Sequence, residues 1–328
     1  MPEQDLHVVV GAGPVGRAVI GELARRGLRV RAVARHGVAD LPAGVETLLA
    51  DVTDPSGAGR AMVGAKVVYH AASAAYDRWP ELLPPLMQGI IEGATAVGAR
   101  VVYADNLYAY GPVDGPLTED LPAHAAGPNG RVRASLAAQL MDADARGSVQ
   151  AAIGRASDFY GPWGRQSTAG ERLFLPALHG KATQVLGDPD LPHTFTYLGD
   201  FARALATLGT HDKAFGQVWH VPSAETLTTR AFIDLVYAAA GNPSKLSVLP
   251  SVLLSLLALV NPTLRAVKEQ QYQRDRSWIV DHSKFARAFE ARVTPHADAI
   301  ALTLAWWRQE GQTPTSVSAT PVAPAGRT

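Results

Sequence analysis

The stretch that decides the fold reads Val8-Val9-Val10-Gly11-Ala12-Gly13-Pro14-Val15-Gly16. An apolar, β-branched run leads directly into glycines spaced G-x-G-x-x-G, and a helical pattern continues to Gly27. Gly11 permits a tight turn, Gly13 lets a phosphate approach the backbone, and Gly16 lets the helix pack on the strand. The free N–H groups at the helix start attract anions. The stretch therefore predicts a strand, a phosphate-binding loop and a helix. The alternative is a glycine-rich turn without a ligand.

Strand and helix signals continue to alternate after this point. The expected strands are His7–Val10, Arg29–Ala34, Thr47–Ala50, Val67–His70 and Arg100–Tyr103, and the expected helices are Val15–Arg26 and Leu82–Val97. Such alternation predicts an α/β fold, a Rossmann-type doubly wound parallel sheet with a smaller C-terminal substrate lobe. We expect a dinucleotide-binding domain over 1–155 with returning segments at about 194–215 and 277–282, a discontinuous substrate-binding lobe over 156–310 and a disordered tail over 311–328.

Composition excludes several classes of function. Lys+Arg and Asp+Glu are both 30, so no global field attracts nucleic acid or an anionic membrane. Cysteine is absent, which excludes disulfides, thiolate zinc sites and cysteine nucleophiles and fits a reducing compartment. The N-terminus lacks the pattern of a secretory signal. We therefore expect a cytoplasmic protein that binds a small molecule, with no metal and no nucleic-acid or membrane partner.

The most apolar window of the chain is Val248–Val260. It is broken by Pro250 and is too short to cross a bilayer, which needs about 20 apolar residues. We expect it to be a buried or pocket-covering helix. A role at a membrane surface is disfavoured, because its polar face lacks the Lys and Arg that such helices use.

The end of the second expected strand favours one nicotinamide cofactor over the other. An NAD site usually ends this strand with Asp or Glu, which accepts from the ribose 2′-OH, whereas an NADP site tends to carry Arg. The strand here ends Ala34-Arg35-His36, with no acid before Asp40. Arg35 is therefore expected to bind a 2′-phosphate, which favours NADP(H) over NAD(H). The alternative is a solvated surface arginine.

Further motifs carry a resemblance to a known family. In chain order they are Asp51-Val52, His70-Ala71-Ala72-Ser73, Val101-Val102-Tyr103 with Tyr110-Gly111-Pro112, Gly154-Arg155 with Phe159-Tyr160-Gly161-Pro162, and Gly187-Asp188 with Phe195-Thr196-Tyr197 and Asp200. Over about residues 5–310 the sequence resembles the extended short-chain dehydrogenase/reductase family, the NAD-dependent epimerase/dehydratase group. A homodimer is typical of that family. The resemblance implies cofactor contacts from Gly11, Gly13, Pro14, Val15, Gly16, Asp51, Val52, Ala71, Ala72 and Arg133.

The catalytic positions depart from the family pattern. The family uses a Ser or Thr and a Tyr-x-x-x-Lys pair, in which lysine lowers the pKa of the tyrosine so that it exchanges a proton during hydride transfer. Asn106 stands at the Ser/Thr position, Asn129 at the tyrosine and Arg133 at the lysine. An amide does not titrate but can hydrogen-bond a carbonyl, and arginine can hold ribose hydroxyls. The alternative is that the helix is aligned one turn out of place.

Other side chains are candidates for the substrate side of the crevice. Tyr108 is the first choice of proton donor, and its alternative is a pocket-wall aromatic. Asp158 and His193 each have a structural alternative. For Asp158 it is a pairing with an arginine such as Arg155. The expected substrate-binding residues are Ser73, Tyr76, Trp79, Asp158, Tyr160 and His193. The lobe is apolar and shows no basic set for a nucleotide-sugar diphosphate, which favours a hydrophobic or aromatic carbonyl compound.

Three functions remain open from the sequence. The first is an NADP-dependent oxidoreductase with a non-standard acid. The second is a non-redox cyclase, isomerase or lyase on the same scaffold, and the third is a catalytically inactive NADP(H)-binding regulatory protein. The fold does not choose among them, because this scaffold hosts many chemistries.

Overall fold

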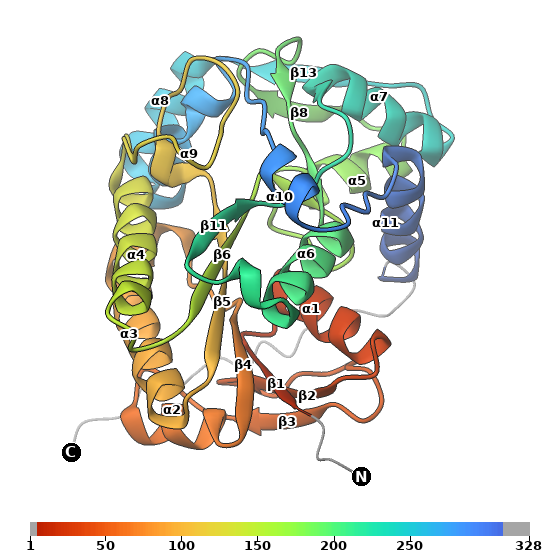
Figure 1. Ribbon diagram of the computed structural model, residues 1–328. Coiled ribbons are helices and arrows are strands. Elements are labelled where there is room, and N and C mark those ends of the chain that lie inside the picture. The colour runs from red at the N-terminus through yellow and green to blue at the C-terminus, as the bar shows by residue number, and fades with distance from the viewer. Residues whose placement is uncertain (1–4, 311–328) are drawn as a thin grey trace, which may run out of the picture.

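A parallel sheet of seven strands forms the centre of the computed structural model, which describes residues 5–310 (Figure 1). The strands lie in the order β11-β6-β5-β4-β1-β2-β3. Their bounds are β1 Leu6–Val10, β2 Arg29–Ala34, β3 Glu46–Leu49, β4 Ala65–His70, β5 Arg100–Asn106, β6 Ala151–Ala156 and β11 Gln217–His220. The order of strands reverses between β1 and β4, and a crevice beyond their carboxyl ends is where this architecture binds ligands. The predicted Rossmann-type fold is confirmed.

Helices cover both faces of the sheet. One face packs against α2, α3 and α4, and the other against α1, α6 and α10. The bounds are α1 Pro14–Arg25, α2 Pro55–Met62, α3 Trp79–Val97, α4 Pro128–Ala145, α6 Leu198–Thr210 and α10 Ser283–Ala288. Because both faces are covered, every residue of β1 and β6 is buried, and neither strand shows the apolar-polar alternation of a half-exposed strand.

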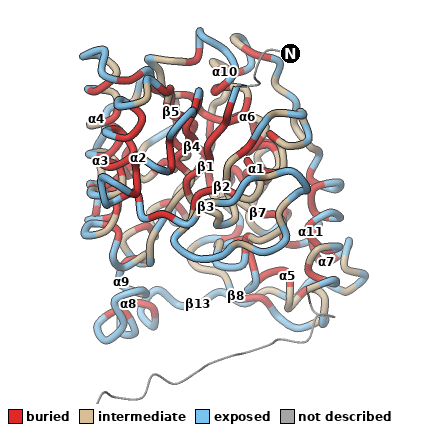
Figure 2. The backbone as a smooth tube through the Cα atoms, turned by 90° about the horizontal axis from the view of Figure 1, so that it is seen from below, coloured by how far each residue is buried: buried red, intermediate tan, exposed pale blue. Residues whose placement is uncertain are grey.

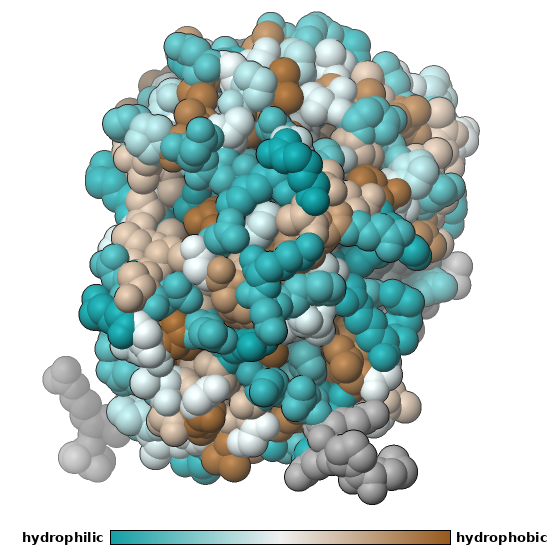
Figure 3. Space-filling view, in the orientation of Figure 1, coloured by the Kyte–Doolittle hydropathy of each residue, from teal (hydrophilic) through white to brown (hydrophobic). Residues whose placement is uncertain are grey.

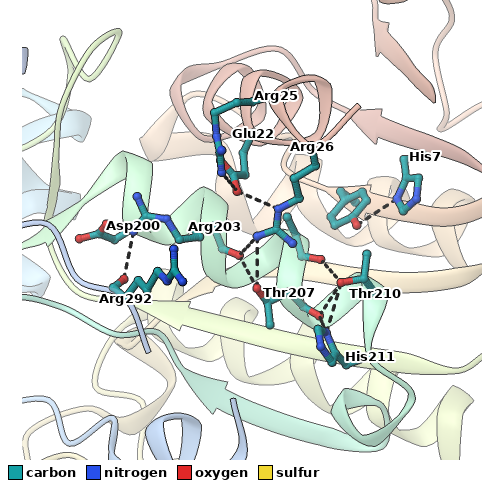
Figure 4. Close-up of polar contacts among 12 residues, drawn as sticks. His7, Glu22, Arg25, Arg26, Asp200, Arg203, Thr207, Thr210, His211 and Arg292 are labelled. Carbon is teal, nitrogen blue, oxygen red and sulfur yellow. Dashed lines mark hydrogen bonds and ion pairs between the residues drawn. The ribbon is translucent and has the colours of Figure 1, made fainter. Parts of the chain in front are cut away.

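Helix α6 returns to the sheet and is fastened to α1 (Figure 4). Arg26 donates to Glu22 over 2.8 Å, and it also reaches the carbonyl oxygen of Arg203 at 3.1 Å and the hydroxyl of Thr207 at 3.3 Å. We expected the segment that returns to the large domain to end at about residue 215. It extends further, because β11 adds a strand to the sheet beyond β6. That strand has only four residues, too few for a distinct alternating pattern.

The substrate lobe has its own core. Helices α5, α7 and α11 surround buried aromatic and aliphatic side chains, with short strand pairs beside them. The helices are α5 Glu171–Leu178, α7 Thr229–Ala240, α8 Ser251–Val260, α9 Pro262–Glu269 and α11 His296–Glu310; the strands are β7 Phe159–Tyr160, β8 Thr183–Leu186, β9 Pro192–His193, β10 Thr196–Tyr197, β12 Leu227–Thr228 and β13 Leu246–Leu249.

One expectation for the lobe is wrong. The window Val248–Val260 was expected to be buried or to cover a pocket, but most of its apolar side chains in α8 are exposed (Figure 2). Hydropathy indicates how strongly a segment avoids water, and it does not supply a neighbouring surface to pack against. Within residues 5–310 no helix has the length and apolarity to cross a bilayer. The tail expected over 311–328 lies outside the described residues.

Candidate functional site

The glycine loop after β1 forms an open cradle. Gly11 has a φ of 97°, and a Cβ there would lie 2.4 Å from the Cα of Ala72, so the loop closes against the turn that follows β4. A Cβ on Gly16 would lie 1.8 Å from the carbonyl oxygen of Gly11. Gly13, by contrast, faces open space, and no side chain caps the start of α1 at this residue. The uncapped N–H groups therefore suit a diphosphate, as a dinucleotide requires.

The residues expected at the adenosine end follow the carboxyl ends of β2 and β3. Arg35 is exposed just beyond β2, and Val52 is buried just beyond β3. Asp51 accepts from the backbone N–H of Thr53 over 2.9 Å and from its hydroxyl over 2.7 Å. These hydrogen bonds, with a smaller contribution from Arg35, hold the pKa of Asp51 below its usual range. The carboxylate is thus fixed within its own turn, beside a cation.

Arg17 is a further candidate for cofactor binding, which the sequence patterns did not indicate. Its Nη1 donates to the carbonyl oxygen of Ala39 over 2.8 Å, and its guanidinium carbon lies 4.2 Å from the ring centre of Trp163. It follows Gly16 directly, so α1 carries this cation beside the glycine loop. The position of Arg17 in the first turn of α1, directly after the glycine motif, could have indicated this residue from the sequence.

The amides at the catalytic positions bind backbone groups. Asn106, at the end of β5, accepts from the backbone N–H of Tyr108 through Oδ1 over 3.1 Å. Asn129, in the first turn of α4, donates through Nδ2 to the carbonyl oxygen of Tyr76 over 2.9 Å. Asn129 therefore ties α4 to the segment that follows β4. Asn129 is also hydrogen-bonded to the side chain of Tyr76, which lowers the pKa of that phenol against the larger effect of burial.

Arg133 points into the protein. Its Nη1 donates to the hydroxyl of Tyr103 over 2.6 Å and lies 3.4 Å from a carboxylate oxygen of Asp105. Its guanidinium carbon also lies 4.1 Å from the ring centre of Trp79. Its Nε is buried without a hydrogen-bond partner among the described residues. Arg133, the residue expected at the lysine position, is thus a buried cation that contacts three side chains.

Asp158 pairs with an arginine, as its structural alternative expected, but the arginine is Arg274 and not Arg155. The register of β5 and β6 sets Arg155 opposite Asp105, and the two form an ion pair of 3.0 Å. Asp158 lies beyond the end of β6. Its Oδ2 lies 3.1 Å from Nη2 of Arg274 and 3.3 Å from Nε2 of His193. Burial opposes its ionisation, but Arg274 and His193 outweigh burial and hold the pKa of Asp158 below its usual range.

Arg274 was not predicted, because no motif surrounds it and it is far from Asp158 in sequence. It also donates to the hydroxyl of Thr168 over 2.8 Å. The side chains of Arg274 and Asp158 are largely enclosed, so their charges cancel where screening by water is weak. This part of the crevice presents no uncompensated positive charge from that pair.

Three aromatic side chains meet beside these groups. The ring centre of Tyr108 lies 6.0 Å from that of Trp79 and 6.4 Å from that of Tyr76, and the latter two are 4.8 Å apart. Burial raises the pKa of Tyr76 to about 12 and raises that of Tyr108 well above its usual value, and the two hydroxyls are hydrogen-bonded. Both phenols therefore stay protonated at neutral pH.

One expected substrate residue lies elsewhere. Tyr160 is fully buried in the core of the lobe, where its hydroxyl lies 3.0 Å from Nδ1 of His296 and its ring packs on Phe232. It is a core residue, which corrects the expectation of a substrate contact. The Tyr-Gly-Pro motif carried the family resemblance, whereas the direction of the Tyr160 side chain depends on the pairing of β7 with β10. Ser73 is exposed in the loop after β4.

The model of the NAD dependent epimerase/dehydratase family matches residues 7–221. No curated protein sequence matches. Similar solved structures include UDP-glucose 4-epimerase from Thermotoga maritima, crystallised with UDP-glucose (TM-score 0.77, 18% identity, 94% of this chain and 100% of that chain), and UDP-glucuronic acid 4-epimerase from Bacillus cereus with UDP-glucuronic acid and NAD (0.76, 19%, 93% and 99%). At these identities the likeness shows the fold. The family model matches most of the chain, and the protein therefore belongs to the NAD-dependent epimerase/dehydratase family.

Proposed function

We propose that the chain is an NADP(H)-dependent oxidoreductase that acts on a carbonyl or hydroxyl group of a hydrophobic small molecule, with Tyr108 as proton donor. The observation that carries this proposal is the place of Tyr108, two residues beyond the end of β5 and among the aromatic side chains of Tyr76 and Trp79. A bound nicotinamide supplies or accepts the hydride. The protonated phenol of Tyr108 supplies a proton to the developing alkoxide.

The cofactor preference rests on the loop after β2. The exposed Arg35 follows the strand where an NAD site usually has an acid, and Arg17 holds the same loop through the carbonyl oxygen of Ala39. The glycine cradle and the uncapped start of α1 suit the diphosphate. Together these groups favour a ligand that carries an additional phosphate on its adenosine ribose.

The substrate preference rests on charge. The similar epimerase structures contain UDP-glucose or UDP-glucuronic acid. In this chain Asp158 compensates Arg274, so a ligand diphosphate would have to compete with a buried carboxylate. The neighbouring wall consists of aromatic rings. Both features support an uncharged, hydrophobic carbonyl compound rather than a nucleotide sugar.

The test combines binding with turnover. Titration of the purified chain with NADPH and with NADH, followed by nicotinamide fluorescence, is expected to show tighter binding of NADPH. A panel of hydrophobic aldehydes and ketones, set beside UDP-sugars, is then expected to consume NADPH only with the former. Binding of neither cofactor contradicts the proposal, and so does consumption only with UDP-sugars.

A non-redox reaction on the same scaffold is the second candidate. It is favoured by the engagement of Arg133 with Asp105 and Tyr103 and by the non-titrating amide at Asn129. Conversion of a substrate without any change in nicotinamide absorbance would establish it. Tight NADPH binding without turnover of any compound would instead support a regulatory protein.

A further inference from the structure

Helix α8 presents apolar side chains to solvent. Val252, Leu256, Leu259 and Val260 are 69%, 58%, 71% and 84% exposed. Leu253 and Leu257 are also exposed. At 3.6 residues per turn, these six exposed apolar positions cover an arc of roughly 160° of the helix surface. Only Leu254 and Ala258 on this helix are classed as buried. Isolated exposed leucines are ordinary, whereas a continuous apolar surface of this kind marks a site of interaction.

This surface lies at a corner of the molecule. Figure 2 shows α8 as a largely exposed coil at the edge, with β13 leading to it and α9 beside it. In Figure 3, hydrophobic residues reach the surface at the upper left, the corner in which Figure 1 draws α8. Its main packing partner is α9. An exposed apolar helix face at the edge of a protein can enter the boundary between lipid headgroups and acyl chains.

Basic residues outnumber acidic ones in the segment around α8. Residues 234–269 contain three basic residues, Lys245, Arg265 and Lys268, all exposed, and two acids at the ends of the segment, Asp234 on α7 and Glu269, which interacts with Arg265. Arg265 donates to the carbonyl oxygens of Ala258 at 3.3 Å and Leu259 at 3.1 Å, so its guanidinium lies at the C-terminal end of α8. Lys268 follows one turn later on α9. The cations that the polar face of α8 lacks are thus supplied by the next helix and by the start of β13.

We propose that α8 docks the protein on the surface of an anionic lipid bilayer. Its ten residues are about 15 Å long, half the thickness of the hydrocarbon core, so the helix lies in the interface and does not cross it. The apolar arc enters the boundary between headgroups and acyl chains, while Arg265 and Lys268 contact lipid phosphates. The expectation of no membrane partner followed from the balanced charge of the whole chain, whereas this surface is locally basic.

Vesicle flotation tests the docking surface. The full chain is expected to float with phosphatidylcholine vesicles that contain about 30% phosphatidylglycerol, and to float less with phosphatidylcholine alone. Replacing two inserted side chains, Leu256→Ser with Leu259→Ser, is expected to lower the partition coefficient by roughly 10²-fold. Leu302→Ser on α11, where the side chain is 53% exposed, is the matched control and is expected to change nothing. Unchanged melting temperatures show that each variant is folded.

A fluorescent probe gives a second measurement. Because the chain has no cysteine, Leu256→Cys allows a single environment-sensitive dye to be attached to α8. Its emission is expected to shift to the blue on anionic vesicles, whereas a dye at Leu302→Cys keeps its emission. If the folded chain binds neither kind of vesicle, the proposal is overturned. It is equally overturned if the double serine variant still floats, or if those substitutions only abolish self-association, which would assign the surface to a second copy.

Discussion

The side-chain amide of Asn129 donates a hydrogen bond to the backbone carbonyl of Tyr76 over 2.9 Å. Asn129, the residue that we expect at the tyrosine position of the family, joins α4 to the segment that follows β4. A residue with this contact positions Tyr76, which in turn is hydrogen-bonded to Tyr108. The Asn129 side chain does not ionise, and its role at this position is to hold Tyr76 in place.

Removing that contact should loosen the crevice. Asn129→Ala is expected to lower the free energy of unfolding by about 1 kcal/mol and to raise KM more than it lowers kcat, because the wall at Tyr76 loses its tie. Ser135→Ala, at an exposed site on the same helix, serves as control. Denaturant unfolding and steady-state kinetics measure both effects. A large fall in kcat with KM unchanged would contradict the positioning role.

The proposed proton donor gives a sharper test. Tyr108→Phe is expected to lower kcat by roughly 10²–10⁴-fold, the usual contribution of a positioned acid, and to leave NADPH affinity unchanged. Because burial raises the pKa of Tyr108 well above its usual value, carbonyl reduction by the unaltered chain should not lose activity through this group between about pH 6 and pH 9. Stopped-flow measurement of NADPH oxidation checks both statements.

A neighbouring tyrosine supplies the control for that experiment. Tyr272 donates its hydroxyl proton to Gln270 over 2.9 Å, and burial raises its pKa as well. Tyr272→Phe removes a similar hydroxyl without removing the proposed donor. Equal losses in the two variants would mean that packing, and not proton transfer, explains the effect.

Cofactor preference should depend on Arg35. Arg35→Ala is expected to weaken NADPH binding by roughly 10–100-fold, the loss of one hydrogen bond to a charged group, and to leave NADH binding unchanged. Arg17→Ala is expected to weaken both cofactors, because Arg17 lies beside the glycine loop that they share. Arg60→Ala, on α2, is the control. Calorimetry of the unaltered chain and the three variants with each cofactor measures the affinities. A parallel loss for NADPH and NADH in Arg35→Ala would refute the assigned role.

The sequence predicted local features well and long-range partners poorly. The glycine loop and the first strands follow from short-range rules, namely periodicity and the need for a small residue at Gly11 and Gly16. The partner of Asp158 does not, because the register of β5 and β6 gives Arg155 to Asp105 and leaves Asp158 to Arg274 from a distant segment. Pairings of this kind are decided by tertiary structure.

The same distinction applies to burial. The motif around Tyr160 and the apolar run of α8 were both recognisable, but the first proved to be core and the second exposed. Whether a side chain faces a crevice, a core or solvent depends on what packs against its element. The sequence pattern of the element does not contain that information.

The enclosed pair of Asp158 and Arg274 should be costly to break. Asp158→Asn leaves Arg274 without its carboxylate and is expected to reduce stability by about 3 kcal/mol. Adding Arg274→Leu to Asp158→Asn should recover much of that loss, because the unpaired charge is then removed as well. Asp190→Asn, which breaks an exposed pair with Arg230, is the control and should not shift the unfolding midpoint. Additive losses in the double variant would argue against a coupled pair.

Two buried histidines should make the protein sensitive to mild acid. Nδ1 of His220 lies 3.0 Å from the carbonyl oxygen of Asp281 and so carries its proton there, which leaves Nε2 to accept from Tyr110 over 2.8 Å. This arrangement holds the ring neutral, and burial, with a smaller contribution from Arg155, lowers the pKa of His220 to about 4. Burial similarly lowers the pKa of His70 to about 3.

A histidine whose pKa is lower in the folded than in the unfolded chain takes up a proton on unfolding, so acid favours the unfolded state. Below about pH 6.5 each such group is expected to reduce stability by about 1.4 kcal/mol per pH unit. His220→Gln should therefore flatten the fall in stability between about pH 7 and pH 5, a window above the titration of ordinary carboxylates. His36→Gln, at an exposed site, should leave the slope as it is. Urea unfolding at a series of pH values measures the slopes, and identical slopes for His220→Gln and the unaltered chain would show that the His220 ring is not held neutral.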